Sequence, residues 1–418
     1  MDRFLITGNR PLGGSVSISG AKNSALKVMA ATLLFQKPVR LKNVPDLMDI
    51  RTMKKVLQVL GAKIEFNHET QTMDVDPSGV NNWNAPYELV KTMRASFQVM
   101  GPLLARFGKA EISLPGGCAI GPRPVDIHLK AFREMGAEIS TEHGYIRAST
   151  SALKSGTIYL DFPSVGATEN VLMAACLTPG ETTIENAARE PEVDDLVAFL
   201  NACGAKISGG GTDRLVINGV NALDPVEHWI LADRIETGTL ILAACITRSS
   251  LEVKRVPIGA LDTFLEKLRE CGNEFEMSGD SIKVFPADSP VGTQITTRPH
   301  PGFPTDLQAP MMAYLATVNG VSLITEGIYE NRFLHLSELL RMGARIQLEG
   351  ASALITGVTK LSGAQVQASD LRGGAALVIA GLAADGRTEI NRVYHIDRGY
   401  EGLENKLQAL GASVERVG

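Results

Sequence analysis

The stretch Leu-Val-Ala-Phe-Leu-Asn-Ala-Cys-Gly-Ala-Lys-Ile-Ser, residues 196–208, contains a complete helix-to-strand transition. Four of its apolar residues recur at the i, i+3, i+4 and i+7 spacing of one helical face: Leu196, Phe199, Leu200 and Cys203. Gly204 follows, and glycine readily adopts the left-handed backbone on which a helix stops. The alternating residues 206–208 are then typical of a strand. The stretch therefore predicts an amphipathic helix that ends at a Gly-Ala pair and leads directly into a strand.

The same transition recurs along the whole chain. Its six junctions are Gly61-Ala62, Gly136-Ala137, Gly204-Ala205, Gly272-Asn273, Gly343-Ala344 and Gly411-Ala412. Consecutive junctions lie 68 to 75 residues apart. Six units of this size account for all 418 residues, so the repeat predicts no separate appended domain.

A second helix is expected upstream of each junction, in a segment that is apolar nearly all round. These segments are residues 25–34, 97–105, 171–177, 240–246, 311–316 and 375–382. A helix without a polar face is usually buried on every side. Each unit is therefore expected to combine one buried central helix, one outer helix and several strands in an α/β fold.

Polar and charged residues gather where the central helices begin, and three of these starts carry a cation: Lys22, Arg94 and Arg372. Ordinary helix capping explains any one start taken alone. The alternative is that several helix N-termini, with their partial positive charge, face one cleft and form an anion site. The three cations favour this alternative.

Composition narrows the class of protein. The net charge is −5, so the chain lacks the excess of basic residues that is typical of a nucleic-acid binder. No apolar stretch approaches the roughly 20 residues that span a bilayer, and the N-terminus resembles no signal peptide. Five scattered cysteines match neither a zinc site nor a disulfide framework. We expect a cytoplasmic protein of a reducing compartment, with no metal, nucleic-acid or membrane partner.

The densest functional signal is Leu-Pro-Gly-Gly-Cys-Ala-Ile-Gly-Pro-Arg-Pro at residues 114–124, where three glycines and three prolines predict a loop. Cys118 within it is either a packed thiol or an exposed reactive one. Arg123 favours the second interpretation, because a nearby cation favours the thiolate. The other cysteines are expected to fill the core as small hydrophobic residues: Cys176, Cys203, Cys245 and Cys271.

Seven motifs, in order along the chain, resemble those of the UDP-N-acetylglucosamine 1-carboxyvinyltransferase family. They are GAKNSAL at 20–26, TMRAS at 92–96, the loop at 114–126, SVGAT at 164–168, AREPE at 188–192, FPTD at 303–306 and HIDRGYE at 395–401. The resemblance runs from residue 6 to the C-terminus. It implies transfer of the enolpyruvyl group of phosphoenolpyruvate to the 3'-hydroxyl of UDP-N-acetylglucosamine, with release of phosphate, as the first committed step of peptidoglycan synthesis.

The resemblance also implies an architecture that fits the six repeats. Two inside-out α/β barrel domains, each of three units with buried central helices, are expected to hold the substrates between them. One domain is expected to contain residues 22–228 and the Cys118 loop. The other is expected to combine residues 1–21 with residues 229–418. The family needs no cofactor, and a monomer is expected.

The roles implied by the resemblance involve both domains. Cys118 would be the general acid that protonates C3, and Asp306 the base that accepts the sugar hydroxyl proton. Lys22 and Arg398 would hold the phosphate and carboxylate of phosphoenolpyruvate, with help from Arg123 and Arg372. The remaining role is contact with the UDP-sugar, assigned to Asn23, Arg94, Arg123, Pro124, Val125, Asp126, Ile127, Ser164, Val165, Asp306 and Ile328. The alternative role for Asn23 is to order Lys22.

Several of these residues also have simpler interpretations. Asp306 alone would be taken for a helix cap. The carboxylates Glu190, Glu192 and Asp397 are either surface or ion-paired groups, or they shape the interdomain hinge or orient Arg398. Some relatives carry a lysine just before the Ser164 motif, where this chain has Phe162-Pro163, so that charge is missing beside the diphosphate.

Two rival functions remain at this stage. The 3-phosphoshikimate enolpyruvyl transferases share the fold and the donor, but the Cys118 loop and the motif at 395–401 favour the UDP-sugar as acceptor. A catalytically silent regulator that binds a sugar nucleotide is the rival from another class. The presence of Lys22, Cys118, Asp306 and Arg398 argues against it.

Overall fold

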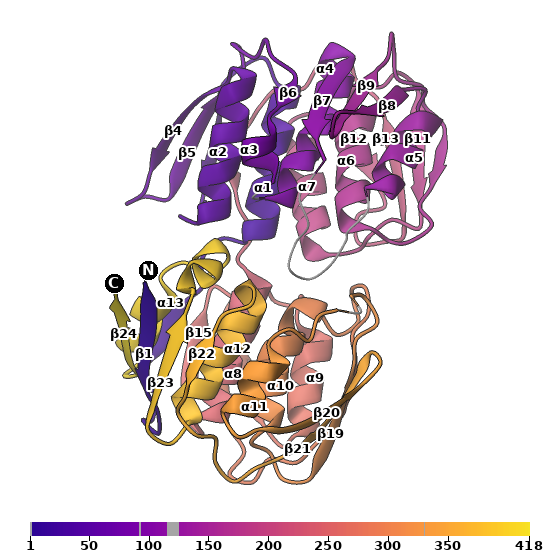
Figure 1. Ribbon diagram of the computed structural model, residues 1–418. Coiled ribbons are helices and arrows are strands. Elements are labelled where there is room, and N and C mark those ends of the chain that lie inside the picture. The colour runs from indigo at the N-terminus through magenta and orange to yellow at the C-terminus, as the bar shows by residue number, and fades with distance from the viewer. Residues whose placement is uncertain (1, 92, 115–124, 330) are drawn as a thin grey trace. The chain divides into compact units, whose positions relative to one another are not determined.

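The computed structural model of the protein describes residues 2–91, 93–114, 125–329 and 331–418 (Figure 1). Cys118, Arg123 and Pro124 lie outside the described residues. The described chain divides into two compact units. The first unit contains residues 20–114 and 125–231, and the second contains residues 2–19 and 232–418.

The first unit repeats one α/β arrangement three times. Its central helices are α1 (Lys22–Ala31) with η1 (Thr32–Leu34), η2 (Arg94–Val99) with α4 (Met100–Phe107), and α6 (Val165–Cys176). Its outer helices are α2 (Met48–Leu60), α5 (Asp126–Glu134) and α7 (Pro191–Ala202), and a short α3 covers Tyr87–Val90. The central helices contact one another, so the helices form the interior of the unit.

Three four-stranded sheets cover these helices. Their strand orders are β14-β3-β5-β4, β6-β7-β9-β8 and β10-β11-β13-β12. The strands are β3 (Val39–Lys42), β4 (Lys63–Asn67), β5 (Thr72–Asp76), β6 (Asn84–Ala85), β7 (Lys109–Ser113), β8 (Glu138–Glu142), β9 (Tyr145–Ser149), β10 (Thr157–Tyr159), β11 (Glu181–Glu185), β12 (Lys206–Ser208), β13 (Arg214–Asn218) and β14 (His228–Trp229). Each sheet has one parallel pair followed by two antiparallel pairs.

The second unit repeats the arrangement. Its central helices are α8 (Arg234–Ile246), η3 (Thr305–Leu307) with α10 (Gln308–Leu315), and α12 (Leu371–Ala383). Its outer helices are α9 (Asp262–Glu270), α11 (Leu336–Arg341) and α13 (Leu403–Ala409), and η4 covers Val393–Arg398. Figure 1 shows α8, α10 and α12 side by side within this unit, and these helices contact one another.

The sheets of the second unit have the orders β16-β17-β15-β2, β18-β19-β21-β20 and β22-β23-β1-β24. Their strands are β1 (Arg3–Thr7), β2 (Ser15–Ser17), β15 (Leu251–Lys254), β16 (Glu274–Ser278), β17 (Ser281–Phe285), β18 (Gln294–Thr296), β19 (Val321–Thr325), β20 (Arg345–Glu349), β21 (Ser352–Thr356), β22 (Gln365–Gln367), β23 (Arg387–Asn391) and β24 (Ser413–Val417). The N-terminal strand β1 therefore lies between β23 and β24, near the opposite end of the sequence.

The predicted junctions and helices are confirmed. Gly61, the C-cap of α2, has φ 110°, and an added Cβ there would lie 2.5 Å from the carbonyl oxygen of Gly79. Glycine is the residue that accepts this left-handed, crowded position. Every residue of α8 is buried, as its unbroken apolar run predicts. The fold is the predicted two-domain inside-out α/β class, with a separate apolar core in each unit.

The central helices begin before their apolar runs, as the polar residues at their starts predict. Helix α8, for example, starts at Arg234, directly after its cap residue Asp233. Within the described parts of the chain, no helix combines the length and the hydrophobicity that a membrane crossing requires.

Candidate active site

Lys22 occupies the first turn of α1 and is 6% exposed. Its Nζ lies 3.3 Å from Oδ2 of Asp49, on the outer helix α2. The N-cap residue Ala21 makes no side-chain cap hydrogen bond. One turn further on, Lys27 Nζ donates to the carbonyl of Asn23 at 3.0 Å. A buried lysine at an amide-rich helix start is suited to bind an anion.

Arg94 begins η2, which packs against α1. Near it lies His128 of α5, which is buried. Burial, with a smaller contribution from the charge of Arg94, lowers the pKa of His128 to about 3. Asn170 Nδ2 lies 3.2 Å from His128 Nδ1, which must accept that hydrogen bond because an amide nitrogen can only donate. The neutral imidazole therefore packs close to Arg94 without adding a second positive charge.

Helix capping explains three of the six central-helix starts. Ser164 caps α6, with its Oγ accepting from the amide of Ala167 at 3.3 Å. Asp233 caps α8 and accepts from two amides at 2.7 and 3.0 Å. Asp370 caps α12 in the same way at 2.9 and 3.0 Å. Side chains therefore cap these three helix ends, as the capping interpretation predicts.

The remaining predicted residues of the first unit lie beside these helix starts. Val165 is the first residue of α6 and follows the Ser164 cap. Val125 is the buried N-cap residue of α5, and Asp126 and Ile127 form its first turn. Gln98 of η2 donates to the carbonyl of Gly166 at 3.1 Å, which connects the end of η2 with the start of α6. In the described part of this unit, the predicted residues therefore lie on or directly before α1, η2, α5 and α6.

In the second unit, Asp306 lies between two buried arginines. Its Oδ1 accepts from Arg332 Nη2 at 2.6 Å, and its Oδ2 accepts from Arg372 Nη2 at 2.9 Å and Nε at 3.1 Å. The arginine side chains are 5% and 1% exposed, whereas the Asp306 side chain is 26% exposed. The guanidinium of Arg372 also lies over the ring of Tyr400, 5.2 Å from its centroid. A solvent-accessible carboxylate is thus held by two cations that water barely reaches.

Arg398 and Ile328 belong to the same unit as Asp306. Arg398 ends η4, which packs against α12. A Cβ added to the next residue, Gly399, would lie 3.7 Å from Arg372 Nη1, so this end of η4 approaches Arg372 closely. The amide of Ile328 donates to Glu326 Oε1 at 2.9 Å.

Sequence reasoning missed the partners of these residues. Asp49, Arg332 and Glu326 fall outside every motif. They reach Lys22, Asp306 and Thr305 across 27, 26 and 21 positions of sequence, respectively. The structure also bears on two of the three acidic residues. Asp397 forms an ion pair with Arg416, at 3.0 Å from Nη1, as the ion-paired interpretation predicts. Glu192 is buried, so the surface interpretation is wrong for that residue.

The four cysteines expected in the core are all buried: Cys176, Cys203, Cys245 and Cys271. Burial raises the pKa of the Cys176 thiol to about 12 and, as the main cause, that of Cys271 to about 12. It also raises the pKa values of Cys203 and Cys245. Thiols of this kind stay protonated and unreactive near neutral pH.

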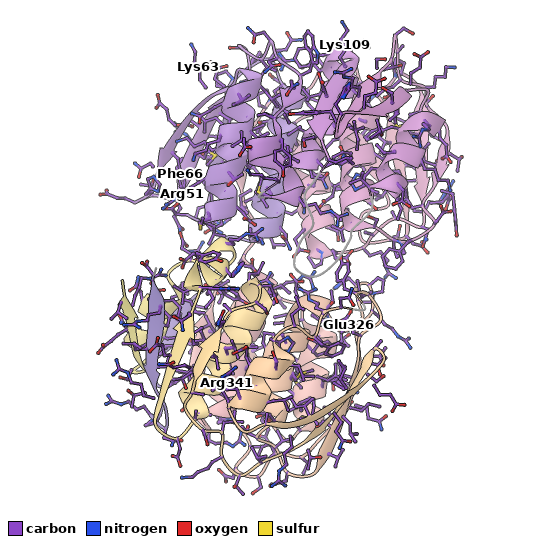
Figure 2. The ribbon with its side chains drawn as sticks, in the orientation of Figure 1. Arg51, Lys63, Phe66, Lys109, Glu326 and Arg341 are labelled. Carbon is purple, nitrogen blue, oxygen red and sulfur yellow. The ribbon has the colours of Figure 1, made fainter. Side chains whose placement is uncertain are left out.

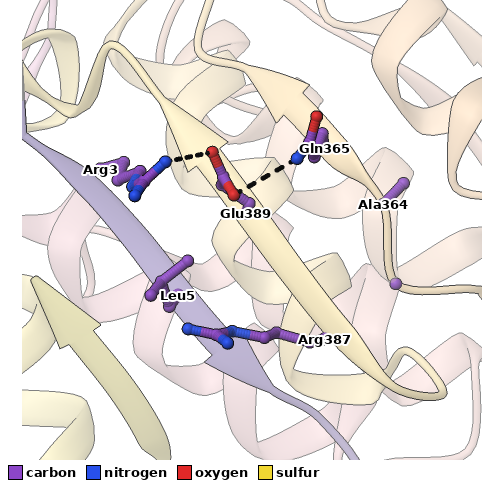
Figure 3. Close-up of a pocket in the computed structure, with 7 residues that line it drawn as sticks. Arg3, Leu5, Ala364, Gln365, Arg387 and Glu389 are labelled. Atoms are coloured by element: carbon purple, nitrogen blue, oxygen red, sulfur yellow. Dashed lines mark hydrogen bonds and ion pairs between the residues drawn. The ribbon is translucent and has the colours of Figure 1, made fainter. Parts of the chain in front are cut away.

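A shallow pocket of about 450 Å³ lies elsewhere, beside β1 and β23 (Figure 3). It is lined by Arg3, Leu5, Gly363, Ala364, Gln365, Arg387 and Glu389. Glu389 already accepts from Arg3 at 3.0 Å and from Gln365 at 3.5 Å (Figure 3). The pocket contains none of the predicted site residues, and its main acceptor is satisfied within the chain.

The EPSP synthase (3-phosphoshikimate 1-carboxyvinyltransferase) family matches residues 6–407. The UDP-N-acetylglucosamine 1-carboxyvinyltransferase of Desulfosudis oleivorans is 53% identical over 417 residues, with both chains covered completely. UDP-N-acetylglucosamine 1-carboxyvinyltransferase 2 of Carboxydothermus hydrogenoformans is 54% identical over 425 residues, again with complete coverage.

Solved structures show the same fold. The enolpyruvyl transferase NikO from Streptomyces tendae superposes with a TM-score of 0.91 at 26% identity, over 100% of this chain and 99% of that one. EPSP synthase from Acinetobacter baumannii has a TM-score of 0.78 at 16% identity over both complete chains, a likeness of fold alone. The chain belongs to the EPSP synthase family of enolpyruvyl transferases, and within it to the group of the UDP-N-acetylglucosamine 1-carboxyvinyltransferases.

Proposed function

We propose that this protein transfers the enolpyruvyl group of phosphoenolpyruvate to the 3'-hydroxyl of UDP-N-acetylglucosamine, the first committed step of peptidoglycan synthesis. Full-length relatives named for this activity support the proposal. The geometric observation that carries it is the placement of Asp306 between Arg332 and Arg372. The two buried arginines orient this carboxylate, keep it in the ionised form that a base needs, and place positive charge beside a site for an anionic substrate.

The donor is the more highly charged reactant at the reacting centre, because phosphoenolpyruvate carries up to three negative charges. Cations must gather around it before it leaves water. We assign its phosphate and carboxylate to Lys22 and Arg398, with Arg123 and Arg372 contributing. Lys22 and Arg372 are both almost completely buried, which strengthens their attraction for an anion.

The reaction needs one base and one acid. Asp306 accepts the proton of the 3'-hydroxyl while that oxygen bonds to C2 of phosphoenolpyruvate. Cys118 donates a proton to C3, which completes a tetrahedral adduct. The C2–O bond to phosphate then breaks and a proton leaves C3, so the product is an enol ether and inorganic phosphate. The steps form one C–O bond, break another and move protons, with no change of overall oxidation state, so the chemistry requires no redox cofactor.

The nucleotide-sugar contacts are proposed at the helix starts of the first unit and at one loop of the second. Backbone amides at such starts suit a diphosphate. The proposed contacts are Asn23, Arg94, Arg123, Pro124, Val125, Asp126, Ile127, Ser164, Val165, Asp306 and Ile328. Residues 22–228 and residues 1–21 with 229–418 are proposed as the two enolpyruvyl transferase domains of a cytoplasmic monomer that binds neither nucleic acid nor membrane.

Phosphate release from phosphoenolpyruvate tests the proposed function. Release is expected with UDP-N-acetylglucosamine and at background level with 3-phosphoshikimate or with no acceptor. Release with 3-phosphoshikimate would assign the chain to the rival enzyme. Binding of the UDP-sugar with no release in any mixture would favour the silent regulator.

Lys22→Ala is expected to raise the KM for phosphoenolpyruvate about thirtyfold, on the order of 2 kcal/mol for a lost charge-assisted contact. The KM for the UDP-sugar should change far less. Arg398→Ala should have the same effects on the two KM values. Steady-state kinetics with each substrate varied in turn provide the measurement. Lys42→Ala, which removes an exposed lysine 2.7 Å from Glu227, is the matched control and should match the wild type.

Lys22→Ala also removes the ammonium group beside the buried carboxylate of Asp49. The double variant Lys22→Ala/Asp49→Asn removes both charges and should recover stability. It is not expected to recover the KM for phosphoenolpyruvate. Equal loss of affinity for both substrates in Lys22→Ala would count against a specific role in binding the donor.

A further inference from the structure

Glu326 is a buried carboxylate one residue beyond the end of β19, in the second unit (Figure 2). Its Oε1 accepts from the hydroxyl of Thr297 at 2.7 Å and from the amides of Ile328 and Tyr329 at 2.9 and 3.1 Å. The hydroxyl of Thr305 donates to it at 3.0 Å. Burial of a carboxylate is costly, so this number of donors indicates a fixed structural centre.

Each threonine at Glu326 relays its hydrogen bond to a second group. Thr305 Oγ1 accepts from Arg332 Nη1 at 2.9 Å, and Thr297 Oγ1 accepts from the amide of Gly327 at 2.8 Å. A hydroxyl has one hydrogen and two lone pairs, while an ionised carboxylate can only accept. Glu326 therefore takes the hydrogen of each threonine and leaves the lone pairs for Arg332 and Gly327.

The first relay leads to the proposed base. Thr305 and Arg332 link Glu326 to Asp306, since Arg332 binds Thr305 through Nη1 and Asp306 through Nη2. The orientation of that guanidinium fixes one oxygen of the Asp306 carboxylate. A shift of Thr305 would move Arg332 and so change the direction in which Asp306 accepts a proton.

The second relay leads to the proposed nucleotide-sugar loop. Thr297 holds the amide of Gly327, and Glu326 itself holds the amide of Ile328. A Cβ at Gly327 would lie 2.6 Å from the carbonyl oxygen of Thr297, so the two backbones approach closely here. The loop is thereby attached at successive amides beside Ile328.

We propose that Glu326 is a positioning residue that aligns the base Asp306 through Thr305 and Arg332, and the acceptor-binding loop at Ile328 through Thr297. This inference rests on the proposed function. One buried carboxylate thus sets the geometry of both proton removal and acceptor binding, without touching either substrate.

The two relays can be cut separately. Thr305→Val keeps the side-chain shape and removes only the relay to Arg332, so kcat should fall about tenfold with little change in the KM for UDP-N-acetylglucosamine. Thr297→Val removes the relay to Gly327. The KM for UDP-N-acetylglucosamine should therefore rise about tenfold, while kcat stays nearly unchanged. Glu326→Ala cuts both and should change both constants.

Two further variants separate positioning from folding. Glu326→Gln keeps one carbonyl oxygen as acceptor. Its kcat and its KM for UDP-N-acetylglucosamine should therefore both lie within about threefold of the wild-type values. Glu185→Ala, at a more exposed glutamate 2.8 Å from Arg214, should match the wild type. Thermal unfolding of each variant reports any general loss of stability.

Wild-type kinetics with UDP-N-acetylglucosamine are measured first. Absence of wild-type turnover would overturn the proposed function and this inference with it. With an active wild type, the inference alone is overturned if Glu326→Ala keeps both constants. It is also overturned if the two threonine variants change kcat and KM in the same proportion, as a merely structural role would.

Discussion

Asp306→Asn is expected to lower kcat by about 10²- to 10⁴-fold, the usual contribution of a positioned general base. An amide cannot take up the proton of the 3'-hydroxyl at neutral pH. The variant keeps an oxygen acceptor for one of the two arginines, Arg332 or Arg372, so the cations remain near the site. The loss is therefore expected mainly in kcat and less in the KM for phosphoenolpyruvate.

A matched control for this substitution is Asp74→Asn, because Asp74 also binds an arginine through both oxygens. Arg40 on β3 places its Nε and Nη2 2.7 and 2.9 Å from the two oxygens of Asp74 on β5, and both side chains are exposed. Loss of that surface pair should leave the kinetics unchanged. A kcat for Asp306→Asn within about threefold of the wild type would remove Asp306 from the proton-transfer step.

The second large effect is expected at Cys118. Cys118→Ala should lose turnover by about 10²- to 10⁴-fold as the general acid is removed. Cys118→Asp should keep part of it, since a carboxylic acid can also donate a proton. The wild type should be alkylated at Cys118 by a small phosphonate-bearing epoxide, an inhibitor type implied by the family resemblance. The phosphonate would bind as the phosphate of phosphoenolpyruvate does, which raises the effective concentration at the thiol.

The other cysteines are internal controls in that experiment. Cys176, Cys203, Cys245 and Cys271 are buried, and burial raises the pKa of each thiol. Peptide mass spectrometry after treatment should therefore find one modified cysteine, with faster labelling when UDP-N-acetylglucosamine is present. Modification spread over several cysteines, or absent at Cys118, would contradict the acid role.

Local pattern was sufficient for most of the fold. The Gly-Ala junctions mark helix ends because glycine adopts the left-handed turn without steric cost, as Gly61 illustrates. The apolar runs mark the central helices because those helices are buried on every side. These signals are contained within about ten residues of sequence, so periodicity and turn chemistry detect them.

Local sequence patterns of this kind do not reveal interactions between segments that are far apart in the chain. Nothing in the composition of β1 indicates that it lies between β23 and β24, and only the family resemblance placed residues 1–21 with the C-terminal half. Arg332 and Glu326 sit in no motif, although they hold Asp306 and Thr305. Their importance follows from packing that brings separate loops together, which a single sequence does not reveal.

The central claim is the transfer of an enolpyruvyl group to the 3'-oxygen of UDP-N-acetylglucosamine. Proton and carbon NMR of the purified nucleotide product, after incubation with phosphoenolpyruvate, tests it most directly. The account predicts two vinylic methylene protons on C3 of the enolpyruvyl group. It also predicts that the neighbouring enol ether carbon, C2, couples to the sugar proton at position 3'. Unmodified UDP-N-acetylglucosamine after full incubation with active protein, or an enolpyruvyl group on another acceptor or another hydroxyl, would contradict the account.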